Sequence, residues 1–273
     1  MNPHDSDLVF DGSIPELYDQ LLVPLIFEPY AIDLVHRLVE LQPQTVLEVA
    51  AGTGVVTRVM AATLHPATEI VGSDLNQPMI DHASAVGTAR PVIWRQADVL
   101  DLPFADSGFD SVVCQFGIMF FPDRVRALSE VRRVLRPGGT FLFNIWDRIE
   151  TNEFAAVVTD ALAELYPDDP PQFLARTPHG YHDESVVQQD LADAGFATPA
   201  GFEPMEARSR AASHMTPAIA YCQGTPLKDE IETRGSGRLE EATSVAAEAI
   251  ARQFGRSDID GLIRGFVVTA KTD

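Results

Sequence analysis

Short apolar runs alternate with longer amphipathic stretches in the first half of the chain. The runs lie at 45–49, 69–73, 92–95, 109–115 and 140–146. They are rich in Val, Ile and Phe and do not alternate strictly with polar residues, which is typical of strands covered on both faces. Strands that alternate with helices form a parallel, doubly wound sheet. We therefore expect an α/β, Rossmann-like, mostly parallel seven-stranded sheet with helices on both faces and a helical lid or insertion.

The flanking regions complete this organisation. An apolar stripe over residues 15–41, interrupted by Pro24 and Pro29, predicts two or three short helices. Residues 167–182 are rich in proline and predict a long loop. The last two strands are expected near 202–209 and 261–270. We predict an N-terminal helical lid at 1–44 and a main domain at 45–273, with lid insertions at about 147–182 and 211–233.

The charge balance narrows the choice of partners. Asp and Glu number 40 and Lys and Arg 20, which gives a net charge of −20. An acidic surface repels phosphate backbones and anionic lipids, so neither nucleic acid nor a membrane is an expected partner. The two cysteines are not in a Cys-x-x-Cys pair, and residues 1–11 are too polar for a signal peptide. We expect a cytoplasmic protein without a metal site. The scarcity of lysine favours a GC-rich bacterial source.

The strongest motif runs from Val46 to Gly54, where a predicted strand enters a glycine-rich turn and then a helix. Such a turn brings a ligand close to the backbone, and the helix N-terminus offers free N–H groups. A dinucleotide fingerprint would need a third glycine, but Thr57 stands at that position. Glu48 at the strand end would repel a pyrophosphate and attract a cation. The alternative is an ordinary tight turn with a solvated glutamate.

Two further acids follow the next two strands. Asp74 closes the second strand and can accept hydrogen bonds from both hydroxyls of a ribose. Asp98 follows the third strand, where its carboxylate can accept from an adenine amino group. Either acid alone is more often a helix cap or a surface residue, but three acids at three successive strand ends indicate a nucleoside site. A nicotinamide cofactor remains an alternative at this point.

These motifs together resemble the class I S-adenosylmethionine-dependent methyltransferases, and within them the ubiquinone/menaquinone-biosynthesis-type group. The matching segments are Leu47–Gly54, Asp74-Leu75, Ala97–Val99, Leu102–Phe104, Phe109-Asp110, Phe120–Asp123 and Leu135–Gly139. They cover roughly residues 45–146 in the family's order and spacing. One departure is Ala50, where the family usually has glycine.

The resemblance implies S-adenosylmethionine as the cofactor. Glu48 and Tyr18 would hold its methionine end, Asp74 its ribose, and Asp98 with Val99 the edge of its adenine. The full set of implied cofactor contacts is Tyr18, Glu48, Ala50, Ala51, Gly52, Gly54, Asp74, Leu75, Met79, Asp98, Val99 and Gln115.

Methyl transfer from a sulfonium is a direct displacement that depends mainly on alignment and exclusion of water. A general base is needed only where the acceptor holds its proton firmly; His179 and His182 are the candidates. Both are alternatively surface or cap-packing histidines. An aromatic and Met-rich lid favours a small apolar or aromatic acceptor. The alternatives are a nicotinamide-dependent oxidoreductase and a non-catalytic cofactor-binding protein, and a homodimer is among the assemblies considered.

Overall fold

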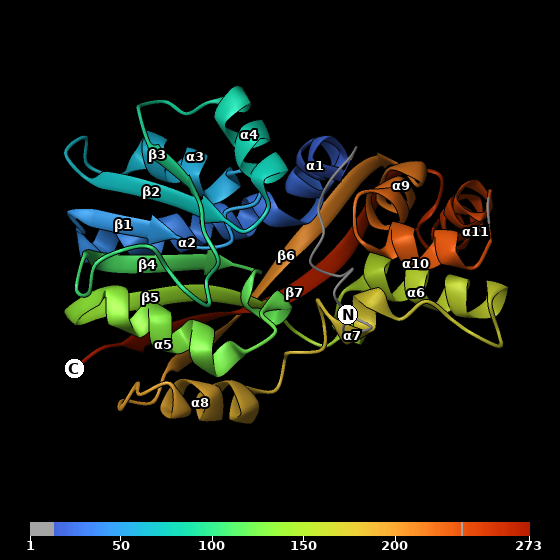
Figure 1. Cartoon of the computed structure of the whole chain (residues 1–273). Coiled ribbons are helices and arrows are strands. Elements are labelled where there is room, and N and C mark those ends of the chain that lie inside the picture. Colours follow the sequence, from blue (N-terminus) through green and yellow to red (C-terminus); the bar gives the residue numbers. More distant parts are fainter. Residues whose placement is uncertain (1–13, 236) are drawn as a thin grey trace. The chain divides into compact units, whose positions relative to one another are not determined.

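The computed structural model describes residues 14–235 and 237–273 (Figure 1). The predicted lid segment before Ile14 therefore lies outside the described residues. The described chain contains a seven-stranded sheet in the order β3-β2-β1-β4-β5-β7-β6. Its strands are β1 (Thr45–Glu48), β2 (Glu69–Asp74), β3 (Ile93–Gln96), β4 (Phe109–Gln115), β5 (Leu135–Trp146), β6 (Gly201–Ser213) and β7 (Ser257–Lys271). The prediction of seven strands in these regions is confirmed, with β5, β6 and β7 longer than expected.

The sheet is parallel over β3, β2, β1, β4 and β5. Strand β7 runs antiparallel to β5: Thr272 near its end donates to Gly139 O near the start of β5. At the other end, the Asp147 amide just after β5 donates to Arg264 O. The chain order reverses between β1 and β4, and a doubly wound sheet binds its ligand at the carboxyl edge beside such a reversal.

Fourteen helical segments connect the strands within the described residues. They are α1 (Ile14–Leu17), a π-helix (Tyr18–Phe27), α2 (Glu28–Leu41), α3 (Val55–Thr63), α4 (Gln77–Val86), a 3₁₀ turn (Ile118–Phe120), α5 (Arg124–Val134), a 3₁₀ turn (Ile149–Thr151), α6 (Glu153–Leu165), α7 (Phe173–Arg176), α8 (Glu184–Asp193), α9 (Met215–Gln223), α10 (Leu227–Thr233) and α11 (Arg238–Phe254). Pro24 and Pro29 were predicted to interrupt the helix over residues 15–41, but this segment is helical throughout. Pro24 lies within the π-helix, and Pro29 takes an early position of α2, where its missing N–H is tolerated.

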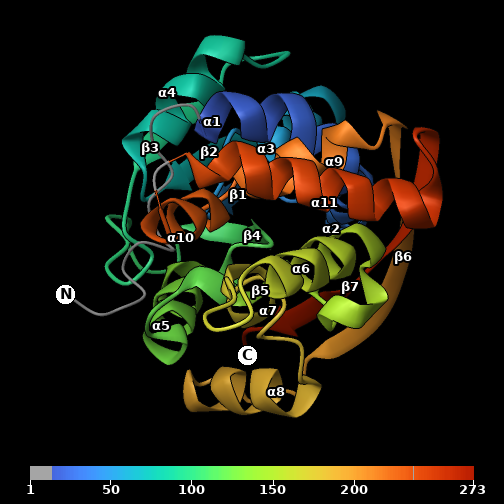
Figure 2. The same cartoon turned by 90° about the vertical axis from the view of Figure 1, so that its right-hand side faces the viewer.

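The chain divides into two compact units. The sheet unit comprises Glu28–Ile145, Tyr181–Met205 and Gly265–Asp273. In it, α2 and α3 pack on one face of the sheet through a buried apolar cluster that includes Leu34, Met60 and Val113. Helix α5 lies on the opposite face (Figure 2) and buries Leu128 and Val131.

The helical unit comprises Met1–Phe27, Trp146–Gly180 and Glu206–Arg264. Its helix α11 packs against α6 and α9, and α9 also contacts the π-helix. Phe154 on α6 meets Phe254 edge to face, with ring centroids 4.9 Å apart. In the described part of the chain, no helix combines the length and apolar character needed to cross a membrane.

The amino end of β1 is held by one carboxylate of the neighbouring strand. Asp110 Oδ2 accepts hydrogen bonds from the amides of Gln44 (2.8 Å) and Thr45 (2.9 Å). Its other oxygen accepts from Arg136. This contact sets where β1 begins relative to β4, and hence where both strands end at the carboxyl edge.

We expect Asp110→Ala to lower the free energy of unfolding by about 1–3 kcal/mol, because it removes an acceptor shared by several donors. Urea unfolding followed by circular dichroism measures the change. Asp106→Ala is the control, since Asp106 also pairs with an arginine, Arg133, but its side chain is 77% exposed. That variant should lose less than about 1 kcal/mol. Equal losses in the two variants would contradict a structural role for Asp110.

Candidate cofactor site

The turn after β1 passes repeatedly through the left-handed backbone region. Ala50 has φ +54°, Gly52 +55° and Gly54 +83°. Gly54 is also the N-cap of α3, so the first turn of that helix opens beside the end of β1. Glycine adopts this region freely, whereas an alanine there is strained. The predicted glycine-rich turn is therefore present. Ala50, which replaces the family's usual glycine, still has the left-handed conformation.

The carboxylate of Asp74 ties this turn to the end of β2. Its Oδ2 accepts from the Gly52 amide at 2.8 Å, and its Oδ1 accepts from the Asn76 amide at 2.8 Å. Burial raises the pKa of Asp74, although these two amides act in the opposite direction. Asp74 thus has a structural role that the sequence did not reveal, in addition to its predicted role toward a ribose.

Glu48, the last residue of β1, is 1% exposed. The Thr57 hydroxyl, one turn into α3, donates to Glu48 Oε2. Burial raises the pKa of Glu48 to about 8, and the nearby Asp74 also raises it. In the sequence, Thr57 serves only as evidence against a dinucleotide fingerprint. In the structure this side chain orients the carboxyl group that is predicted to face the methionine end of the cofactor.

Gly117, just after β4, packs so closely against Ala50 that no side chain fits at position 117. A Cβ atom at Gly117 would lie 2.5 Å from the Ala50 Cβ and 2.9 Å from Cys114 Sγ, which is too close for either contact. Gly117 follows β4 after Gln115 and Phe116, so it brings the end of β4 against the turn. Sequence reasoning missed Gly117, and the only available signal was a glycine just after a strand.

The third strand end joins the same edge. The Ala97 amide, just after β3, donates to Asp74 O at 2.9 Å, so the chain leaves β3 beside the end of β2, and Asp98 is the next residue. Asp98 is exposed, and its Oδ1 accepts from the Leu100 amide. The sheet order β1-β2-β3 therefore brings Glu48, Asp74 and Asp98 along one edge.

The remaining predicted contacts of the sheet unit differ in exposure. Met79 is buried on α4, whereas Leu75 is 45% exposed beside Asp74. Val99 and Gln115 are half-buried. Thr53, in the turn itself, is 1% exposed, and its hydroxyl has no hydrogen-bond partner among the residues that the structure describes. A bound polar ligand would supply the missing partner, so the turn fits a cofactor with polar groups.

Three further residues were predicted to take part in cofactor binding or catalysis. Tyr18 belongs to the helical unit, where its ring stacks on Phe27 with centroids 4.9 Å apart. His179 is in the same unit, 6% exposed, with Nδ1 2.8 Å from Asp147 O. His182 is exposed in the sheet unit, next to Asp183, which caps α8.

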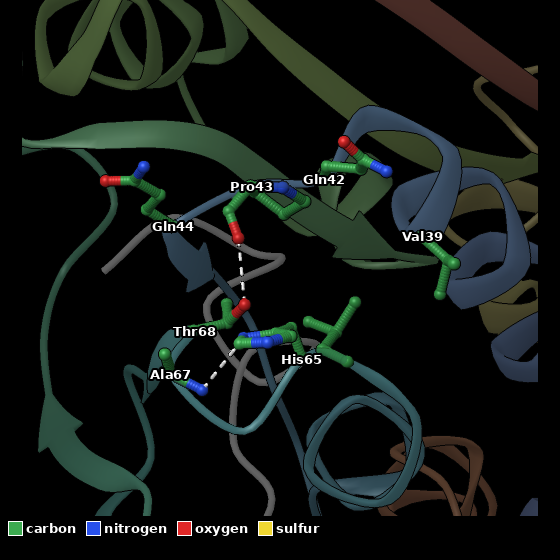
Figure 3. Close-up of a pocket in the computed structure, with 8 residues that line it drawn as sticks. Val39, Gln42, Pro43, Gln44, His65, Ala67 and Thr68 are labelled. Carbon is green, nitrogen blue, oxygen red and sulfur yellow. Dashed lines mark hydrogen bonds between the residues drawn. The ribbon is translucent and has the colours of Figure 1, made fainter.

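A separate cavity of about 560 Å³ lies at the amino ends of the strands (Figure 3). It is lined by Gln44, which precedes β1, and by His65, Ala67 and Thr68, which precede β2. His65 Nδ1 accepts from the Ala67 amide, and the Thr68 hydroxyl donates to Pro43 O. The strands separate this cavity from the turn at their carboxyl ends, so it is not part of the predicted cofactor site.

Comparison with known proteins agrees with this geometry. Residues 47–143 match the family model described as "Methyltransferase domain". Over these residues the chain is similar to methyltransferases. The match begins inside β1 and ends inside β5, so it includes all three strand-end acids and the turn. The predicted family and its S-adenosylmethionine cofactor are confirmed at the level of this domain, and the comparisons give no support to a nicotinamide oxidoreductase.

Two curated relatives are similar to this methyltransferase domain. A demethylmenaquinone methyltransferase of Thermus thermophilus is 40% identical over 111 residues, which are 40% of this chain and 49% of the relative. The ubiquinone/menaquinone biosynthesis C-methyltransferase UbiE of Ectopseudomonas mendocina is 31% identical over 172 residues, covering 55% of this chain and 64% of the relative. The chain thus spans about half to nearly two thirds of the length of these relatives.

A solved structure confirms the fold over a greater length. The YcgJ protein of Bacillus subtilis aligns with a TM-score of 0.56 at 17% identity, covering 89% of this chain and 98% of its own. Because its sequence identity is low, it shows the fold alone.

We expect Glu48 to make the protein less stable as the pH rises. The folded chain keeps the Glu48 proton up to a pH of about 8, whereas the unfolded chain releases it near pH 4 to 5. Between these two pKa values, the Glu48 carboxyl group therefore lowers the free energy of unfolding by up to about 1.4 kcal/mol for each unit that the pH rises. Glu48→Gln keeps the shape and a Thr57 contact but does not titrate.

Thermal unfolding of both proteins from pH 5 to 9 measures this effect. The midpoint of Glu48→Gln should rise relative to the parent chain as the pH increases. A difference between the two proteins that stays constant across this range would show that Glu48 titrates normally.

Proposed function

We propose that the chain is an enzyme that transfers the methyl group of S-adenosylmethionine to a small apolar or aromatic molecule. The observation that carries the proposal is the convergence of Glu48, Asp74 and Asp98 at three adjacent strand ends, around a left-handed turn. This set of acceptors suits a ligand with ribose hydroxyls, an amino-purine and cationic groups, and it would repel phosphates.

The acceptor is assigned to the helical unit. The segment that matches the family model, 47–143, lies wholly within the sheet unit. Most of the predicted lid, by contrast, falls within the helical unit, including residues 147–180 and 211–233. The names of the two curated relatives favour a quinone-like aromatic ring. The net charge of −20 supports an uncharged or cationic acceptor over nucleic acid.

Aromatic side chains of the helical unit support an aromatic acceptor. Phe27 lies 6.1 Å from Trp146 between ring centroids, and Trp146 lies 5.9 Å from His179. With Tyr18 stacked on Phe27, these rings form a continuous series from the π-helix to the loop after α7. Offset and tilted ring contacts of this kind also suit a planar ligand.

The protein's own part in the reaction is alignment and proton handling. When bound, S-adenosylmethionine would supply an activated methyl group for direct attack by the acceptor, with S-adenosylhomocysteine as the leaving group. Glu48 and the turn hold the cofactor, and Asp74 fixes the ribose. Between the two histidines, the geometry favours His179 as a general base. A carbonyl oxygen only accepts, so Asp147 O requires a proton on His179 Nδ1, and the neutral ring then has Nε2 as its basic atom.

The cofactor assignment is tested by calorimetry and by transfer of a labelled methyl group. We expect micromolar binding of S-adenosylhomocysteine and no binding of NADH. Label from S-adenosylmethionine should appear in an apolar aromatic acceptor, with demethylmenaquinone as the first candidate and simple phenols as the second. Asp74→Ala should weaken binding by about 1.5–3 kcal/mol, because it removes charged hydrogen bonds to the ribose. Preferential binding of NADH would overturn the proposal.

The role of His179 is tested with two amides that copy different ring nitrogens. Asn places its NH₂ near Nδ1 and keeps the bond to Asp147 O, whereas Gln places it near Nε2. Neither amide accepts a proton, so both His179→Asn and His179→Gln should lower turnover about 100-fold or more, with little change in cofactor affinity.

His182→Ala is the matched comparison for these variants. It should change turnover by less than about threefold if His179 is the base. The reverse pattern, with a large loss at His182 and none at His179, would transfer the role to His182. No loss at either position would indicate an acceptor that needs no base.

A further inference from the structure

The indole ring of Trp94 on β3 lies against two glycines of the sheet unit. In the β2–β3 register Trp94 is the partner of Gly72. A Cβ atom at Gly72 would lie 2.5 Å from Trp94 Cζ3 and 2.7 Å from Cε3. A Cβ atom at Gly54 would lie 2.7 Å from Trp94 Cη2. No side chain fits at either position while the ring occupies this space.

Glycine is required at positions 54 and 72 for different reasons. Gly54 has φ +83°, so its backbone alone favours glycine. Gly72 lies inside β2 without a left-handed φ, and glycine in a strand interior lacks a side chain to pack and weakens the strand. Such a glycine marks a close approach by another group, and here that group is the Trp94 ring. Gly72 is therefore explained by Trp94 and not by the backbone.

The contacts of Trp94 lie next to the groups that form the cofactor site. Gly54 is the N-cap of α3, so its position sets the start of the helix that carries Thr57. A Cβ atom at Gly72 would also lie 3.1 Å from the Thr57 hydroxyl, which donates to Glu48. Gly72 is two residues before Asp74, whose carboxylate accepts from the turn. The Trp94 ring thus packs against Gly54 at the end of the turn and against Gly72 in β2, the two segments that the Asp74 carboxylate connects.

We propose that Trp94 is a positioning residue for the cofactor. It holds the start of α3 and the end of β2 at the separation that keeps Glu48 and Asp74 in place, without itself binding the cofactor. This inference rests on the proposed function, because it concerns the affinity of the same site. Its physical basis is that a rigid, well-packed aromatic ring fixes the spacing of the two backbones that contact it.

The first test compares Trp94→Leu with Trp94→Phe. Calorimetry should show about tenfold weaker binding of S-adenosylhomocysteine to the leucine variant, because the shorter side chain leaves the turn unsupported. Phenylalanine, which keeps a flat ring, should restore affinity to within about threefold. With a confirmed acceptor, the KM for S-adenosylmethionine should rise in Trp94→Leu while kcat stays within about twofold.

The second test is a double-mutant cycle that stays informative if one variant is unstable. Gly72→Ala places a methyl group in the ring's space and should weaken S-adenosylhomocysteine binding about tenfold. Combined with Trp94→Leu, the same alanine should cost much less affinity than it does alone, because the ring's space is then open and only the 3.1 Å contact with the Thr57 hydroxyl remains. Gly201→Ala is the control: nothing lies within 4 Å of its Cβ position, so it should have no effect in either background.

The outcomes separate the two proposals. A parent chain that fails to bind S-adenosylhomocysteine overturns the proposed function. A parent chain that binds, with unchanged affinity in Trp94→Leu, overturns the role of Trp94 alone. Additive losses for Gly72→Ala and Trp94→Leu would also overturn it, since the two positions would then act independently.

Discussion

The left-handed turn between β1 and α3 is the constraint on which the rest of the site depends. Through it, the chain reverses so closely that the Gly52 amide reaches the Asp74 carboxylate at the end of the next strand. The end of β4 approaches this turn so closely that Gly117 has no room for a side chain, and Gly54 has a left-handed φ beside the Trp94 ring. A residue that moved this turn by an ångström would disturb the start of α3 and two strand ends together.

Two buried carboxyl groups beside this turn set its electrostatic character. Removing a carboxylate from water favours the protonated form and raises the pKa of both groups, while the Thr57 hydroxyl at Glu48 and the Gly52 and Asn76 amides at Asp74 act in the opposite direction. The ligand-free site therefore resists holding both negative charges. A cationic ligand relieves this unfavourable state, whereas an anionic one would worsen it, which accounts for the selectivity proposed for the site.

The fold was predictable because each strand can be recognised from a short, continuous segment of the sequence. A strand covered on both faces has a continuous apolar run, and each run of the sequence became a strand. The three acids were predictable for the same reason, since each one lies within or shortly after a run. The contact between Trp94 and Gly72 depends instead on the register between two strands, which the sequence does not display. The proton position on His179 likewise depends on a carbonyl distant in sequence, at Asp147.

The chain passes between its two units five times, because each unit is assembled from three separate stretches. A gene fusion or a single recombination event would therefore not exchange the helical unit for another. Replacement would require three coordinated grafts, and three of the crossings fall within the strands β5, β6 and β7. We expect relatives of this chain to have acquired new acceptors by gradual substitution inside a fixed framework, and engineered changes of acceptor to succeed by the same route.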